Sequence, residues 1–237
     1  WGISIECGEL ENPWNEPPAD AYQWTEDLEN TPDKEFNLKI AFQNGKPISL
    51  NGMKMNCVKL VKKLNKIGSN YGIGRIDMVE DRLVGIKSRE IYETPAAEIL
   101  LKAHKELESI TLDRETIKFK ENISHKYADL IYNGLWFSPL KESIDSFINN
   151  TQKSVNGVVK LKLNKGNAIV VGRKSKNSLY QYNLATYDEK DSFDHEDAPG
   201  FINLWALPVQ VANQVKKESN ENNWNKEVKN LKATAGK

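Results

Sequence analysis

The sequence predicts an α+β fold in which an antiparallel sheet built from hairpins packs against helices. Apolar residues alternate at 36–42 and again at 159–163, and a short turn motif follows each run. Apolar residues at helical spacing lie in separate runs, at 58–67 and 95–110. Hairpins grouped apart from helices are typical of α+β proteins and argue against a doubly wound parallel sheet.

The first half of the chain starts with an irregular segment at 1–34, which opens inside a strand. Four prolines there prevent long helices, and the aromatic residues Trp14, Tyr22 and Trp24 predict packing against the body rather than disorder. The strand at 36–42 returns through Asn44-Gly45 as an edge strand at 47–50. A helix follows, for which Gly68 is the expected C-cap.

The stretch 70–98 is the centre of the chain. We expect a loop at 71–74, strands at 75–79 and 83–86, and a helix that begins at Thr94-Pro95. Polar side chains crowd around these strand ends: Glu80, Asp81, Lys87, Ser88, Arg89 and Tyr92. Strand ends beside a helix N-terminus bind small polar ligands well. A surface loop laced with ion pairs fits the composition equally well.

The helix from Pro95 is expected to continue through Thr111 to Lys120. Ser124 is the expected cap of a further helix that ends at Asn133-Gly134, and another helix covers 140–148. The clearest hairpin then turns at 164–167.

The end of the chain is more polar. A basic corner at 173–176 fits a solvated face better than a phosphate site. We expect a short helix or turn at 201–207 and a polar helical arm at 209–237, anchored by Trp224. The predicted domains are therefore 1–208 and the C-terminal helical arm 209–237.

Composition excludes several classes of protein. Thirty-three basic residues balance thirty-three acidic ones, which argues against nucleic-acid and membrane-surface binding. No apolar run reaches about 18 residues, and no secretory leader is visible. Cys7 and Cys57 form no metal or redox motif and fit reduced thiols in the cytoplasm. The three histidines, His104, His125 and His195, lack partner motifs, so no metal or catalytic role is expected for them.

Several long segments resemble the argininosuccinate synthase family. The central motif is GIGRIDMVEDRLVGIKSREIYETPAA, and the match extends to SIECGELENPWNEPP, TLDRE, YADLIYNGLWFSP, LKLNKGNAIVVGRKSKNSLY and DAPGFINLWAL. Glu90 and Ala97 depart from the glycines usual in the family. The match starts partway through the family, after its nucleotide-binding domain.

The resemblance implies a cytoplasmic ligase that joins citrulline to aspartate with ATP, through a citrullyl-adenylate. ATP, with its Mg²⁺, and aspartate would bind mainly to the nucleotide-binding domain, and Gly72 and Gly74 do not form its phosphate loop. This chain alone would then be inactive. Family members are usually tetramers whose C-terminal arm reaches a neighbouring subunit.

The resemblance also assigns citrulline contacts to three residues, Ser4, Glu80 and Tyr92. For Glu80, the alternative is an ion pair with Arg75, Arg82 or Arg89. No direct role is expected for Lys87 or Arg89. A non-catalytic ligand-binding or assembly module is the other reading of the chain, and a Gly-rich nucleotide loop ahead of Trp1 in the native polypeptide would exclude it.

Overall fold

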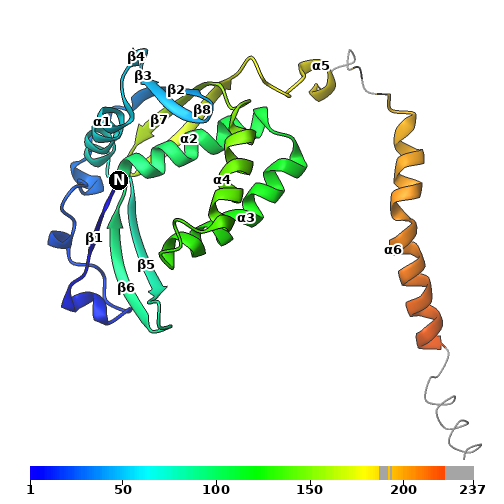
Figure 1. The fold of residues 1–237 in the computed structure, drawn as a ribbon, viewed down its shortest axis with the longest axis horizontal. Helices are drawn as coiled ribbons and strands as arrows, with labels where there is room; N and C mark the ends of the chain where they lie inside the picture. The colour runs from blue at the N-terminus through cyan, green and yellow to red at the C-terminus, as the bar shows by residue number, and fades with distance from the viewer. Residues whose placement is uncertain (187–191, 193, 222–237) are drawn as a thin grey trace, which may run out of the picture. The chain divides into compact units, whose positions relative to one another are not determined.

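The computed structural model describes residues 1–186, 192 and 194–221, and these residues have the predicted α+β fold. The chain divides into two compact units, Trp1–Tyr180 and Gln181–Lys237, which are described separately. The first unit contains two antiparallel sheets with helices packed beside them (Figure 1).

The larger sheet has the strand order β4-β3-β2-β7-β8. Its strands are β2 (Phe36–Gln43), β3 (Lys46–Leu50), β4 (Met53–Lys54), β7 (Gly157–Asn164) and β8 (Asn167–Lys174). Both predicted hairpins are confirmed, and Asn44 and Gly45 have the positive φ values, 47° and 72°, that a tight turn needs. The short β4 pairs with the end of β3, so β3 is not the edge strand that was predicted.

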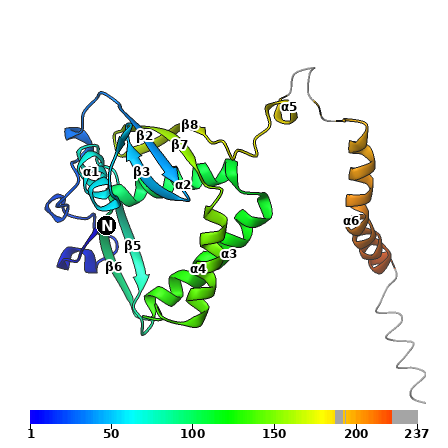
Figure 2. The same ribbon diagram turned by 45° about the horizontal axis from the view of Figure 1, so that its top comes forward.

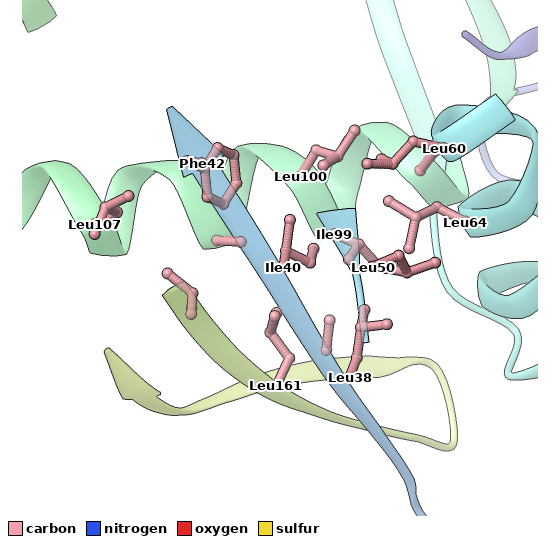
Figure 3. Close-up of a cluster of buried hydrophobic side chains, with 14 of the residues drawn as sticks. Leu38, Ile40, Phe42, Leu50, Leu60, Leu64, Ile99, Leu100, Leu107 and Leu161 are labelled. Carbon is pink, nitrogen blue, oxygen red and sulfur yellow. The ribbon is translucent and has the colours of Figure 1, made fainter. Parts of the chain in front are cut away.

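The main core lies between this sheet and two helices, α1 (Cys57–Asn70) and α2 (Pro95–Thr111). Figure 3 shows Leu38, Ile40 and Phe42 of β2 pointing toward the leucines and isoleucine of the helices. Burying one such side chain contributes about 1.5–3 kcal/mol. This core fixes the position of α2, whose first residue follows directly on the central hairpin.

Gly68 does not cap α1 as predicted, because the helix continues to Asn70. A Cβ atom on Gly68 would lie 2.8 Å from Pro95 Cβ, so glycine here allows α1 and α2 to approach closely. Gly74 has a φ of 93°, and a Cβ atom there would lie 2.6 Å from the nitrogen of Pro95. Gly68 and Gly74 therefore both meet packing requirements at the start of α2.

Two further helices, α3 (Arg114–Tyr132) and α4 (Pro139–Gln152), form an antiparallel hairpin. The expected break at Ser124 is wrong: α3 is continuous, and Ser124 Oγ donates to the carbonyl of Glu121 inside it. Asp113 caps the helix instead, since its Oδ1 accepts from Thr116 N at 3.0 Å. The aromatic rings of Phe119 and Phe147 join the two helices.

The smaller sheet has the order β1-β6-β5, formed by β1 (Ile3–Ile5), β6 (Lys87–Glu93) and β5 (Arg75–Asp81). The predicted strand at 83–86 is wrong, because these residues form the turn between β5 and β6. Gly85 N donates to Arg82 O at 2.7 Å, and Gly85 has a φ of 81°. Figure 2 shows this hairpin beside α3 and α4, and Tyr132 Oη donates to Asp81 O at 2.8 Å.

The segment before β2 crosses the small sheet with three short 3-10 turns, η1 (Gly8–Glu11), η2 (Ala19–Ala21) and η3 (Leu28–Asn30). Leu10 and Ala21 of this segment form a second small core with Ile5 and Ile91. The irregular segment packs against the body as predicted, but of the three aromatic residues expected to do so only Tyr22 joins this core, whereas Trp14 and Trp24 are exposed.

The second unit contains α5 (Tyr182–Ala185) and α6 (Asp197–Glu221). The predicted start of the arm helix at Val209 is wrong, because α6 begins at Asp197 and contains Pro208. Phe201 and Trp205 stack on one another along α6, with ring centroids 5.5 Å apart. Trp224, the predicted anchor, lies outside the described residues.

Candidate functional site

The three residues predicted as ligand contacts lie on one face of the β1-β6-β5 sheet. Ser4 and Tyr92 are direct cross-strand partners, and side chains of such partners point to the same face. Glu80 lies opposite Ser88 on β6, four residues from Tyr92 and therefore on the same side. We call this surface the open face, and it also carries Glu90.

The hydroxyl of Tyr92 joins two carboxylates on the open face. Tyr92 Oη lies 2.9 Å from Glu80 Oε2 and 2.9 Å from Glu90 Oε2. Burial raises the pKa of the Tyr92 hydroxyl well above its usual value, and its hydrogen bonds to Glu90 and Glu80 raise it further. Tyr92 therefore remains a hydrogen-bond donor at physiological pH.

No ion pair neutralises these two carboxylates within the part of the chain that the structure describes. Two of the arginines named as alternative partners of Glu80 are held by other acidic residues, and Arg82 forms no ion pair with a described residue. Arg75 Nη1 contacts Asp27 at 2.8 Å, and Arg89 Nη2 contacts Asp77 at 2.6 Å. The ion-pair explanation of Glu80 therefore finds no support among the described residues.

The opposite face of the sheet, which we call the packed face, centres on Glu93. This side chain is fully buried. Its carboxylate accepts hydrogen bonds from the backbone nitrogens of Gln23 at 2.8 Å, Trp24 at 3.1 Å and Thr25 at 2.7 Å, and from Thr25 Oγ1 at 2.6 Å. Sequence reasoning missed Glu93, because no side-chain motif reveals a carboxylate whose partners are mostly backbone groups.

Arg89 is the second anchor of the packed face. Its guanidinium donates to the carbonyls of Asn12 at 3.0 Å and Asn15 at 2.9 Å, besides its contact with Asp77. The hydrogen bond from Arg89 lowers the pKa of the Asp77 carboxyl below its usual value. Lys87 Nζ pairs with Asp81 at 2.7 Å, and both side chains are exposed. Both basic residues thus have partners within the protein.

The N-terminus of α2 is not the open ligand site that was predicted. Pro95 and Ala96 are buried, and Ala96 N donates to Asn65 Oδ1 at 2.9 Å. Thr94 occupies the N-cap position, but its side chain makes no capping hydrogen bond. The polar residues of the central stretch are therefore divided between two faces of a sheet and do not surround a helix end.

Two hollows of the described surface leave out the three predicted ligand contacts, although one of them is lined by Lys87, Ser88 and Arg89 of the central stretch. One of about 800 Å³ lies beside α1 and is lined by Trp1, Trp24 and Val58 among others. Another, of about 510 Å³, includes Cys7 and Arg82. Neither is lined by Ser4, Glu80 or Tyr92, so these residues form a partly exposed face rather than a closed cavity.

The same described residues provide neither a metal site nor a membrane-spanning helix. They contain no group of three or more His, Cys, Asp or Glu side chains placed to hold a metal ion. His104 Nε2 bonds to Gln152 Oε1 at 2.8 Å, which agrees with a structural role for this histidine. No described helix is both long and apolar enough to span a bilayer.

Comparisons with known proteins agree with the sequence motifs. A family model for the arginosuccinate synthase C-terminal domain matches residues 1–212. The chain is 55% identical over 210 residues to the argininosuccinate synthase of Trichodesmium erythraeum, covering 89% of this chain and 52% of that protein. It is 52% identical over 231 residues to that of Brevibacillus brevis, covering 98% of this chain and 55% of the relative.

A third argininosuccinate synthase, from Lactiplantibacillus plantarum, is 56% identical over 216 residues, which are 91% of this chain and 53% of the relative. The chain thus spans about half the length of the curated relatives it matches. Because the family model covers most of the sequence, the chain belongs to the argininosuccinate synthase family.

Proposed function

We propose that this chain is the citrulline-side and assembly portion of an ATP-dependent ligase that forms argininosuccinate from citrulline and aspartate. Two observations support the proposal: the family assignment, and an open face on which Glu80 has no ion-pair partner among the described residues. The family assignment carries most weight, and the second observation adds that the Glu80 carboxylate is available to a positively charged group of a ligand.

In the proposed reaction, the ureido oxygen of citrulline attacks the α-phosphorus of ATP, and pyrophosphate leaves. The amine of aspartate then displaces AMP from the citrullyl-adenylate. ATP, with its Mg²⁺, and aspartate are proposed to bind mainly to the half of the family's length that lies outside this chain. The residues of this chain contribute by orienting citrulline, which is catalysis by positioning.

Each residue of the open face has a role that suits one group of citrulline. Glu80 can accept a charge-assisted hydrogen bond from the α-ammonium group. Ser4 supplies a hydroxyl donor for an oxygen atom of the ligand, whereas the Tyr92 hydroxyl donates to a carboxylate of the open face and leaves its oxygen to accept from the ligand. The raised pKa of the Tyr92 hydroxyl keeps that donor protonated.

A Glu80→Gln variant tests the proposal in an assembled enzyme that contains this region and the remaining half of the family's length. Removing one charge-assisted contact costs about 1.5–3 kcal/mol, so the KM for citrulline should rise about tenfold or more. The KM for ATP should not change. Glu29→Gln, at an exposed position, is the control. Equal changes in both KM values would show that Glu80 is structural.

The chain by itself is proposed to lack ligase activity, because its sequence contains no Gly-rich phosphate loop. Pyrophosphate release from ATP, measured with citrulline and aspartate present, should equal the rate without protein. Release well above that rate would contradict the proposal. Citrulline binding without any activity, in the longest native polypeptide, would instead favour a non-catalytic module.

Assembly into a homo-oligomer, a tetramer by the resemblance, is proposed to involve α6 and the residues that follow. The helix exposes a series of large apolar side chains: Phe201, Ile202, Leu204, Trp205, Leu207, Val209, Val211 and Val215. Such side chains favour burial against a partner surface. Sedimentation of the chain with and without residues 209–237 tests this, and an unchanged oligomeric mass after deletion would contradict it.

A further inference from the structure

The hydroxyl of Tyr92 cannot satisfy both carboxylates that approach it. A phenol has one proton to donate, yet Glu80 Oε2 and Glu90 Oε2 each lie 2.9 Å from Tyr92 Oη. One carboxylate therefore accepts the proton, while the other faces the hydroxyl oxygen without a donor. Two negative groups that share one neutral donor repel each other unless a cation lies between them.

The described residues supply no such cation. Neither glutamate forms an ion pair with a described lysine, arginine or histidine, although the packed face of the same sheet pairs its charges. A second polar group on the open face also lacks a partner. Ser88 lies on β6 opposite Glu80, and its Oγ is buried without a hydrogen bond to any described residue.

Glu90 therefore has a role that the known contacts of the chain do not explain. Resting on the proposed function, we infer that Glu90 is a second carboxylate acceptor for the α-ammonium group of the amino-acid substrate. An ammonium group carries three N–H donors and one positive charge. Glu80, Glu90 and the oxygen of Tyr92 supply three acceptors, and the charge offsets the repulsion between the carboxylates.

This arrangement makes Glu90 a residue that determines specificity. A ureido compound without the α-ammonium group would leave both carboxylates uncompensated beside Tyr92. Two carboxylates left unpaired beside a bound ligand cost more than a matched contact gains, so such an analogue should be rejected strongly. Removing the charge of Glu90 should relax that rejection and weaken citrulline binding together.

The test uses the assembled enzyme described above and compares Glu80→Gln, Glu90→Gln and the control Glu29→Gln. For Glu90→Gln, we expect the KM for citrulline to rise about five- to tenfold, with kcat and the KM for ATP nearly unchanged. Discrimination between citrulline and 5-ureidopentanoate, which lacks the ammonium group, should fall by a similar factor. Glu90→Met, which also removes the charge, should reproduce both changes.

The outcomes separate this inference from the proposed function. If Glu80→Gln raises the KM for citrulline but Glu90→Gln and Glu90→Met change neither KM nor discrimination, the role of Glu90 is overturned and the proposed function stands. If no variant changes the KM for citrulline, the role of Glu90 and the proposed function are both overturned. An equal change in the KM values for citrulline and ATP, or a lowered unfolding midpoint that accounts for the loss, would show that Glu90 is structural.

Discussion

The packed face of the β1-β6-β5 sheet gives its charged groups partners from distant parts of the chain, whereas the open face leaves Glu80 and Glu90 without cations. Glu93 on the packed face accepts four hydrogen bonds from residues 23–25, and Asp77 is held by Arg89. Because both faces belong to the same short strands, β5 and β6, local sequence does not cause the difference. The charged groups of the packed face have partners inside the fold, whereas the carboxylates of the open face remain available to a ligand.

The largest effect is expected from Glu93→Gln on the packed face. An amide in place of the carboxylate loses charge-assisted bonds and points an N–H group at backbone donors. Unfolding by urea should show a loss of about 3 kcal/mol. Glu29→Gln, which changes an exposed glutamate in the segment just beyond residues 23–25, should have no measurable effect. A loss below about 1 kcal/mol would contradict the contrast between the two faces.

A smaller effect, dependent on pH, is expected from Asp77→Asn. The pKa of Asp77 in the folded chain is below its unfolded value, which is about 3.9. The carboxylate therefore contributes stability above about pH 4, and this contribution is lost as pH falls through the folded pKa. The variant should be less stable at pH 7 and lose less stability on acidification.

Unfolding midpoints measured between about pH 2 and pH 7 check this prediction. Asp20→Asn, at an exposed position on the N-terminal segment, provides a matched control. An unchanged slope in the acid range for Asp77→Asn would mean that the Arg89 contact does not stabilise the fold.

The smallest effect on stability is expected on the open face. Glu80→Gln and Glu90→Gln each remove one of two mutually repelling charges, so the free energy of unfolding should change by less than about 0.5 kcal/mol or increase slightly. The same urea measurements check this. A loss comparable to that of Glu93→Gln would mean that the carboxylates of the open face also stabilise the fold, which would argue against a binding role.

Sequence patterns predicted the large sheet well, because its hairpins depend on local chemistry. The Asn44-Gly45 turn and the β7–β8 turn each need residues that tolerate positive φ, and such residues are visible in the sequence. Strand β6 was missed because its residues, KSREIYE, are mostly polar, and the apolar residues beside it form the turn. Its strand conformation depends on pairing with both β1 and β5.

Other errors came from contacts that no local pattern reveals. Gly68 looks like a helix cap, yet its role is to let Pro95 approach α1. Ser124 and Pro208 look like boundaries, yet both lie inside helices. For the site, the family motif pointed to Ser4, Glu80 and Tyr92. The contact between Glu90 and Tyr92 could not be predicted, because it depends on both residues lying on the same face of strand β6, which the sequence did not reveal as a strand.

The carboxylate of Glu93 also has a consequence for the order of folding. Its contacts join residues 68–70 positions apart, whereas the β5–β6 hairpin and the α1–α2 pair close much shorter loops. Loops that close late gain their contacts after the transition state has formed. Loss of the Glu93 carboxylate should then accelerate unfolding and leave the folding rate nearly unchanged. The lifetime of the folded chain, rather than the speed of its formation, would depend on this one carboxylate.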